Sequence, residues 1–130
     1  MHTVVDTNVL VSALLNSGGA PAKVLALALS RQITPCFDDR ILREYESVLL
    51  RPKFGFCEED VVELLGRLRE IGLCVVPPPL NAAFADEADR KFYEVAKFCG
   101  AVLVTGNLKH FPKEPEVVSP IEFLKLFSCL

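Results

Sequence analysis

The fold is decided by the stretch Thr3-Val4-Val5-Asp6-Thr7-Asn8-Val9-Leu10, near the start of the chain. Its opening residues are β-branched and predict a short buried strand, with Asp6 at the carboxyl end of that strand. An apolar, helix-compatible segment follows from residue 8 to residue 15 and ends at the turn Asn16-Ser17-Gly18-Gly19. A buried strand that passes directly into a helix is typical of domains in which helices cover a parallel sheet.

The rest of the chain repeats this alternation of strands and helices. Short apolar segments predict further strands at residues 33–37, 73–76, 101–104 and 117–118. Apolar residues at the helical period predict helices from 21 to 29, from 38 or 39 to about 50, from 58 to about 71, from 86 or 87 to 99, and from 119 to 127. Short, fully apolar strands are buried on both faces. We therefore predict a single α/β domain over residues 1–130, with three α/β/α layers around a mostly parallel sheet.

Composition supports one compact domain and excludes several other classes. The 130 residues are 51% apolar and 24% charged, which excludes intrinsic disorder as a description of the whole chain. The most apolar stretch, from Val9 to Leu15, is far shorter than the roughly 20 residues needed to cross a bilayer. Asp6 and Asn8 argue against a signal peptide. We expect a cytoplasmic location and no membrane contact.

Cysteine usage and net charge limit the kinds of site and partner. The five scattered cysteines include no Cys-x-x-Cys pair, which argues against a disulfide framework or a zinc site. Most of them stand beside apolar residues, which predicts small buried thiols in a reducing compartment. The net charge of −3 gives no overall attraction to nucleic acid. A polyanionic partner must therefore be held by a local basic patch or through bound metal.

Polar side chains follow two of the predicted strands, where an α/β domain binds its ligands. In such sheets the ligand site lies beyond the carboxyl ends of the strands, near the point where strand order reverses. Asp6 follows the first strand, and Thr105, Gly106 and Asn107 follow the fourth. A buried acid is costly unless a positive group meets it, so Asp6 is a candidate ligand for a cation. The alternative is that Asp6 caps the helix that follows.

Two further segments supply acids whose roles are equally ambiguous. Asp86 and Asp89 lie at the start of the fifth predicted helix, where the helix dipole favours anions. Their alternative role is a capping pair, which we favour for Asp86, whereas Asp89 lies on the margin between core and solvent. Glu44 and Glu46 lie on opposite flanks of the apolar face of the third predicted helix. Periodicity alone does not choose between these two glutamates.

Convergence of Asp6, one of these glutamates and Asp89 would require compensating charge. At about 5 Å and an effective dielectric near 20, each pair of carboxylates repels by roughly 3 kcal/mol. Three such pairs would consume much of the ~5–15 kcal/mol that stabilises a small domain, so protons or a cation must neutralise them. Oxygen ligands favour a hard divalent ion such as Mg²⁺ or Mn²⁺. Such an ion activates water and stabilises an in-line displacement at phosphorus.

Four ordered segments together resemble the PIN-domain nuclease family. The first is Val4-Val5-Asp6-Thr7-Asn8-Val9-Leu10, a strand followed by Asp-Thr-Asn. The second comprises Glu44-Tyr45 through Val48-Leu49 and then Arg51-Pro52-Lys53-Phe54, as in the branch of VapC-like toxin components of toxin–antitoxin pairs. The third and fourth are Asp89-Arg90-Lys91-Phe92 and the segment from Ala101 to Asn107. The likeness covers essentially the whole chain.

The resemblance implies a ribonuclease that hydrolyses RNA phosphodiester bonds with Mg²⁺ or Mn²⁺ and activated water. Carried over by position, the metal-binding and catalytic acids of the family fall on Asp6, Glu44 and Asp89. Many members have a fourth acid where this chain has Asn107. The amide oxygen of Asn107 can still reach a metal-bound water, but this replacement lowers the negative charge of the site by one and leaves open whether one metal or two bind.

The resemblance also implies supporting residues and partners. Three polar residues beside the acids would orient them: Thr7, Asn8 and Thr105. Basic residues near the motifs are candidates for binding RNA phosphates, although each alone is better explained as part of a solvated face: Arg43, Arg51, Lys53, Arg90 and Lys109. His110 is a candidate base or an exposed loop histidine. The family implies an antitoxin partner and a homodimer. Five apolar residues near the end of the chain are candidates for the contact between subunits, or else they dock the last helix on the sheet: Phe123, Leu124, Leu126, Phe127 and Leu130.

Three other functions compete with this hypothesis. A signalling receiver domain has a similar sheet, but it needs paired acids after its first strand and an Asp after a central strand. Here Asp6 stands alone, and prolines follow Val76. A catalytically weak or inactive PIN-like module that only binds RNA or a partner is kept open by Asn107. A nucleotide-binding enzyme is disfavoured, because the chain has no Gly-x-Gly-x-x-Gly motif and no P-loop lysine.

Overall fold

Five short parallel strands form the sheet of the protein. They are β1 (His2–Val5), β2 (Thr34–Phe37), β3 (Leu73–Cys74), β4 (Val102–Val104) and β5 (Val117–Val118). In this computed structural model, which describes residues 1–129, the strands pair in the order β3-β2-β1-β4-β5. The register places Val5 opposite Val104, so the carboxyl ends of β1 and β4 lie side by side at the centre of the sheet.

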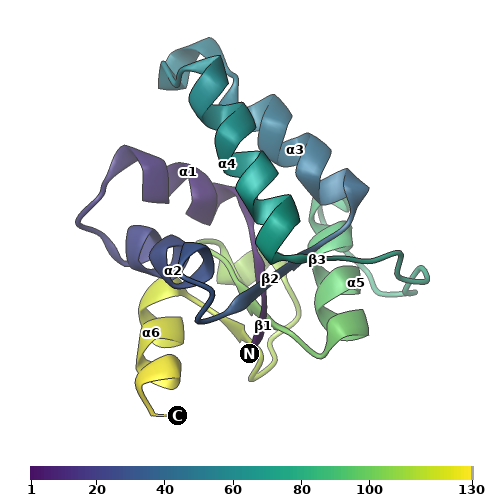
Figure 1. The fold of residues 1–130 in the computed structure, drawn as a ribbon. Helices are drawn as coiled ribbons and strands as arrows, with labels where there is room; N and C mark the ends of the chain where they lie inside the picture. Colours follow the sequence, from purple (N-terminus) through teal and green to yellow (C-terminus); the bar gives the residue numbers. More distant parts are fainter. Residues whose placement is uncertain (130) are drawn as a thin grey trace.

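Six α-helices connect these strands, together with three short 3-10 turns. The helices are α1 (Thr7–Leu15), α2 (Ala20–Leu29), α3 (Asp39–Leu49), α4 (Glu58–Ile71), α5 (Arg90–Cys99) and α6 (Pro120–Ser128), and the turns are η1 (Pro52–Phe54), η2 (Glu87–Asp89) and η3 (Leu108–His110). Figure 1 shows α5 on one side of the sheet, α2 and α6 on the other, and α3 with α4 as a hairpin that extends beyond the strands. Within residues 1–129 no single helix is long and apolar enough to cross a membrane, and α1 and α2 meet that criterion only as a pair bent by 102°.

The core has two parts because the strands bury both of their faces. Along β4, Leu103 packs with one hydrophobic cluster, whereas Val102 and Val104 pack with the other. The first cluster joins the sheet to α3, α4 and α5, and the second joins it to α2 and α6. The predicted three-layer α/β/α class with a parallel sheet is therefore confirmed.

Two predicted boundaries differ by more than one residue from those in the structure. The third strand ends at Cys74 rather than at residue 76, although the Val75 N–H still donates to the Phe37 carbonyl of β2 at 2.9 Å. Pro77-Pro78-Pro79 have no N–H groups, so this pairing does not continue beyond them. The fifth helix begins at Arg90, three or four residues later than predicted, because residues 87–89 form η2 instead. Asp86 caps this turn, since its Oδ1 accepts a hydrogen bond from the Ala88 N–H at 2.9 Å. The capping role that we favoured for Asp86 is confirmed.

The C-terminal helix docks on the sheet. Phe123 is fully buried in the second cluster, and Leu124 and Phe127 pack beside it. Leu126, by contrast, is 40% exposed. Leu130 lies outside the described residues. The apolar pattern of this helix is thus explained in large part by its contact with the rest of the domain.

The prediction that most cysteines are buried is wrong. All five are free thiols, and Cys36 alone is buried. Cys57 directly precedes α4, Cys74 lies on the edge strand β3, and Cys129 directly follows α6, so all three are exposed. Apolar neighbours in sequence predict burial inside an element, but they do not predict it at the end of a helix or at the edge of a sheet.

A buried carboxylate helps to hold the long connection between β3 and η2, together with Arg90, which donates to the Leu80 carbonyl at 2.7 Å, and the packed Phe84 ring. Glu94 on α5 is 2% exposed, and its Oε2 accepts a hydrogen bond from the Leu80 N–H at 2.8 Å. Its Oε1 lies 2.9 Å from Arg40 on α3. Arg40 also pairs at 2.7 Å with Asp38, the residue that caps α3. This network joins α3, α5 and residues 75–86, so the connection is fixed although it has no regular secondary structure.

Close packing at the end of α4 predicts an intolerance to side chains at Gly72. A Cβ at Gly72 would lie 2.6 Å from the Pro35 carbonyl oxygen and 2.7 Å from the Leu68 carbonyl oxygen. These backbone atoms have no room to move, so we expect Gly72→Ala to lower the free energy of unfolding by about 1–3 kcal/mol. Gly66→Ala is the matched control in the same helix. Nothing lies within 4 Å of a Cβ there, and alanine should stabilise α4 by about 0.5–1 kcal/mol.

Urea unfolding of the two variants beside the parent protein measures both effects. Equal free energies of unfolding for Gly72→Ala and Gly66→Ala would contradict the close approach of α4 to β2.

Candidate functional site

Asp6 lies at the end of β1, where the order of the strands reverses. It is 6% exposed. Thr105, at the end of β4, donates a hydrogen bond to Asp6 Oδ2 at 2.8 Å, and the Asn8 side-chain amide donates to the same oxygen at 3.3 Å. Asp6 occupies the N-cap position of α1, but its side chain makes no capping hydrogen bond. The alternative that Asp6 is a helix cap is therefore wrong, and its carboxylate is left for the site.

The charge of Asp6 is not compensated by a basic side chain. Burial raises the pKa of Asp6 to about 6, the Thr105 hydrogen bond opposes this shift, and the Asp89 and Glu44 carboxylates add to it. None of the ion pairs within residues 1–129 involves Asp6. Both of its side-chain hydrogen-bond donors, Thr105 and Asn8, are neutral. A buried acid of this kind is a place where a cation would be stabilised.

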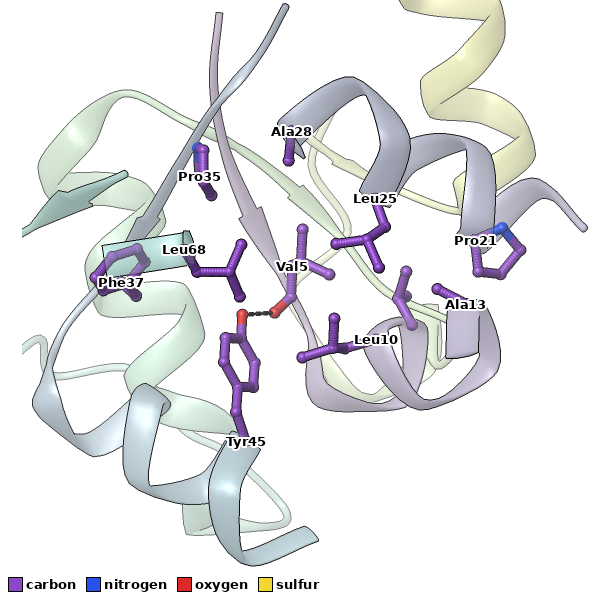
Figure 2. A pocket seen from close by; sticks show the side chains of 11 residues that line it. Val5, Leu10, Ala13, Pro21, Leu25, Ala28, Pro35, Phe37, Tyr45 and Leu68 are labelled. Atoms are coloured by element: carbon purple, nitrogen blue, oxygen red, sulfur yellow. Dashed lines mark hydrogen bonds between the residues drawn. The ribbon is translucent and has the colours of Figure 1, made fainter. Parts of the chain in front are cut away.

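Helix α3 brings Glu44 to the same place. The Tyr45 hydroxyl donates a hydrogen bond to the Val5 carbonyl, which ties α3 to the last residue of β1 (Figure 2). Next to Tyr45, Glu44 accepts a hydrogen bond from the Thr7 hydroxyl through Oε2. Glu44 Oε1 lies 2.7 Å from Lys91 Nζ. Glu46 is exposed and does not line the cleft that contains Glu44. The structure thus separates the two glutamates that periodicity left equivalent.

A small apolar cavity lies beneath the hydrogen bond between Tyr45 and Val5, as Figure 2 shows. Side chains from β1, α1, α2 and α4 surround it, among them Val5, Leu25 and Leu68. No charged residue lines this cavity. We assign it to the core below the site, because a ligand site needs polar groups to orient its ligand.

Asp89 is the last residue of η2 and directly precedes α5, and the turn η3 brings His110 beside it. His110 Nδ1 lies 3.4 Å from Asp89 Oδ2. Burial raises the pKa of Asp89, whereas His110 lowers it. Lys91, two residues along the chain, donates to the Ala88 carbonyl as well as pairing with Glu44. His110 is exposed, as one of our two alternatives expected, but it faces an acid of the site.

The loop after β4 is fixed by hydrogen bonds to the same residues. The backbone N–H of Asn107 donates to the Thr105 hydroxyl at 2.9 Å, and that hydroxyl donates in turn to Asp6. The Gly106 N–H donates to Asn8 Oδ1 at 3.1 Å. Thr105 and Asn8 therefore orient Asp6 and hold this loop beside it at the same time.

One open cleft contains most of the residues that the sequence singled out. Seven of the predicted site residues line it: Asp6, Thr7, Asn8, Glu44, Arg51, Asp89 and Asn107. The candidate base His110 does so too. Thr105 is fully buried directly behind Asp6. The cleft lies at the carboxyl end of the sheet, where the sequence placed the ligand site. Phe54 also lines its wall.

The basic residues predicted to bind RNA lie around this cleft, and they differ in whether an acidic side chain already pairs with them. Arg43 and Arg90 line a neighbouring groove that shares Glu44 with the cleft. Arg90 is held by Glu87 at 2.7 Å, whereas Arg43 and Arg51 make no ion pair within residues 1–129. Lys53 Nζ lies over the Phe54 ring, and Lys109 is exposed in η3.

Comparison with known proteins assigns this arrangement to a family. A family model described as PIN domain matches residues 2–109. The chain belongs to the PIN domain family. The uncharacterized protein MJ1680 of Methanocaldococcus jannaschii is 32% identical over 110 residues, which cover 82% of this chain and 71% of the archaeal protein. No solved structure matches the chain significantly.

PIN domains are generally nucleases and typically use divalent metal ions. In this PIN domain the acids do not crowd together as tightly as the sequence led us to expect. Within residues 1–129 no group of three His, Cys, Asp or Glu side chains is arranged to hold a metal ion. Lys91 lies against Glu44 and His110 against Asp89 in this arrangement. The donor set nevertheless consists of carboxylate and amide oxygens around an uncompensated Asp6, which fits a hard divalent cation.

The raised pKa of Asp6 predicts a stability of this PIN domain that depends on pH. Because the ordinary pKa of an aspartate side chain is 3.8 and that of Asp6 in the fold is about 6, the folded protein binds the proton more tightly than the unfolded chain. This contribution is complete below about pH 4 and is lost as pH rises through about 6. At about 1.4 kcal/mol per pKa unit, it amounts to about 3 kcal/mol.

Asp6→Asn keeps an acceptor for Thr105 and removes the charge. In EDTA we expect the variant to be more stable than the parent by up to about 3 kcal/mol at pH 7–8, and no more stable below pH 4. Denaturant unfolding across this pH range measures the difference. A variant that gains no stability relative to the parent between pH 4 and pH 8 would show that Asp6 titrates normally.

Proposed function

We propose that this PIN domain is a metal-dependent ribonuclease that hydrolyses RNA phosphodiester bonds with Mg²⁺ or Mn²⁺ and activated water. One observation carries the proposal. Asp6 is a buried carboxylate without a basic partner in the described chain, and it shares a cleft at the switch point of the sheet with Glu44 and Asp89. Such a cleft stabilises a doubly charged ion and leaves room for a phosphate beside it.

The residues divide the work as follows. Asp6, Glu44 and Asp89 would hold the ion, and Asn107 would contact it through water. When bound, a divalent ion polarises the phosphate and lowers the pKa of water. Thr105 and Asn8 keep the Asp6 carboxylate oriented, and Thr7 does the same for Glu44. These hydrogen bonds limit how far the two carboxylates can rotate.

Lys91 has a second role in this proposal. Its ammonium lies at Glu44, inside the group of acids, and donates also to the Ala88 carbonyl. A cation entering the cleft competes with this ammonium for Glu44, and the displaced Lys91 is then available to an RNA phosphate. Basic residues around the cleft would make further contacts with RNA phosphates: Arg43, Arg51, Lys53, Arg90 and Lys109.

We extend the proposal to a toxin of a toxin–antitoxin pair in the cytoplasm. The support is the sequence likeness of the second motif, whose segment Arg51-Pro52-Lys53-Phe54 forms η1 at the wall of the cleft. An antitoxin would cover the acidic cleft, and a homodimer would use the exposed side of α6, where Ile121 is 60% and Leu126 40% exposed.

A module that binds RNA without cleaving it is the second candidate. Two observations favour it: Asn107 stands at the fourth acidic position of the family, and Lys91 and His110 already occupy two of the three acids. This candidate predicts RNA binding that is independent of added metal and no hydrolysis under any condition.

The nuclease proposal predicts cleavage of RNA in Mn²⁺ or Mg²⁺ that stops when EDTA is added. Asp6→Asn and Asp89→Asn should reduce the rate by more than about 100-fold, beyond the 10–100-fold cost of losing a residue that only orients a ligand. Glu44→Gln should lower the rate strongly, whereas Glu46→Gln is the matched control and should leave it within about two-fold. Gel analysis of a labelled RNA measures all four. Equal losses in the two glutamate variants, or activity in EDTA, would contradict the assignment.

The toxin proposal predicts that induced expression of the protein arrests bacterial growth. Asp6→Asn expressed to the same level should not arrest growth, because the same ion-binding carboxylate is needed. Culture density after induction and immunoblots of protein level provide the measurement. Normal growth with a fully active nuclease would reject the toxin role and leave the ribonuclease role standing.

A further inference from the structure

A short aromatic and cationic ledge borders the acidic cleft. It consists of Arg51, Lys53, Phe54 and Phe56, in and directly after η1. Arg51 and Phe54 line the same cleft as Asp6, Glu44 and Asp89. The function proposed above uses the basic residues here only as phosphate contacts, and it gives the two aromatic rings no role.

The backbone builds this ledge as a rigid element. Pro52 begins η1, and the Phe54 N–H donates to the Arg51 carbonyl at 3.1 Å. Gly55 then adopts a left-handed conformation with φ of 67°, which other residues rarely adopt. This turn brings residues 54 and 56 onto each other, with ring centroids 5.8 Å apart and planes inclined by 17°. Both rings pack against the core on one side and are half-buried, so they are held in place.

The two cations on the ledge are free to bind an anion. Arg51 and Lys53 are both exposed, and neither forms an ion pair or a side-chain hydrogen bond within residues 1–129. Lys53 Nζ lies 5.1 Å from the centroid of the Phe54 ring. An exposed cation–π contact is worth only about 0.5–1 kcal/mol, so the ammonium leaves the ring readily when a phosphate is offered.

We propose that this ledge is a nucleobase-stacking subsite, which takes one unpaired base of single-stranded RNA on the Phe54 ring next to the bond being hydrolysed. Lys53 moves from the ring to the phosphate of the stacked nucleotide, and Arg51 contacts the phosphate nearer to the cleft. Aromatic rings beside cations are the general means of holding single strands. The subsite rests on the proposed ribonuclease function for its substrate, although its test does not require cleavage.

The subsite selects single strands for a geometric reason. In a duplex both faces of each base are covered by its neighbours, so no face is available to Phe54. A loop or an unpaired end can turn one base out onto the ring. The protein therefore distinguishes RNA structure at this point, and the stacking itself does not depend on which base is present, because every base has an aromatic face.

Binding of fluorescent RNA in Mg²⁺ tests the subsite, with Asp6→Asn as the parent so that no cleavage occurs. We expect Phe54→Leu in this parent to weaken binding of a single-stranded RNA by about five-fold or more, the lower range for one stacked base. A series of the same RNA, each with one abasic position at a different place in the strand, locates the stacked base. With Phe54 present, one of these RNAs should show a matching loss of affinity. With Phe54→Leu, the same RNA should show no further loss of affinity. A duplex of the same sequence should bind both proteins equally.

Two control variants separate stacking from folding. Phe54→Tyr keeps an aromatic ring and should retain the affinity of the parent, whereas a general disturbance of η1 would weaken both variants. Phe98→Leu changes an aromatic residue on α5 that is 54% exposed and does not line the cleft, and it should bind as the parent does.

Unchanged binding by Phe54→Leu, or an equal loss for single strand and duplex, would overturn the subsite. That result would leave the ribonuclease proposal intact if the wild-type protein cleaves RNA. If the wild-type protein does not cleave RNA, but Phe54→Leu weakens binding only where the stacked base is present, the ribonuclease proposal is overturned and the subsite stands.

Discussion

The parallel pairing of β1 with β4 is the constraint on which the site depends. These strands are far apart in sequence, and their register sets Val5 opposite Val104, so that the next residues, Asp6 and Thr105, become neighbours. One hydrogen bond between these two side chains then fixes the carboxylate at the centre of the sheet edge. A shift of one residue in either strand would turn the side chains to the other face and dissolve the site.

Charge compensation within the cleft is shared unevenly. Glu44 has Lys91 and Asp89 has His110, whereas Asp6 has only neutral donors. Lys91 therefore relieves part of the repulsion among these acids from within the protein, and His110 is close enough to contact Asp89. Asp6 remains buried without a basic partner, so a cation in the cleft would be stabilised most strongly at the Asp6 carboxylate. The neutral side chain of Asn107 fits this picture, because it adds an oxygen without adding to the repulsion.

The sequence predicted the layers and the edge of the sheet that forms the site, because strand burial and connection rules depend on local patterns. Asp6 and Asn107 could be placed together for the same reason. The choice between Glu44 and Glu46 could not be made from periodicity, since it depends on the Tyr45 hydroxyl reaching the Val5 carbonyl across the fold. The pairing of Lys91 with Glu44 was missed as well. It requires the start of α5 to meet α3, and the only signal was a lysine two residues after Asp89. The burial of cysteines failed because exposure at the ends of elements is a tertiary property.

The connection that Glu94 helps to hold has a consequence for hydrogen exchange of its backbone amides. The Glu94 carboxylate joins Leu80 to Arg40 across α5, and no backbone N–H from residue 81 to residue 86 has a hydrogen-bond acceptor among the described residues. Those amides are therefore open to exchange with deuterium from water while the sheet is still closed. The segment nevertheless stays packed on the domain, because Arg90 also donates to the Leu80 carbonyl at 2.7 Å and the Phe84 ring packs against Tyr93 and Phe111. The same stretch leads into η2 and Asp89, so backbone amides without a hydrogen-bond acceptor among the described residues adjoin one of the three acids.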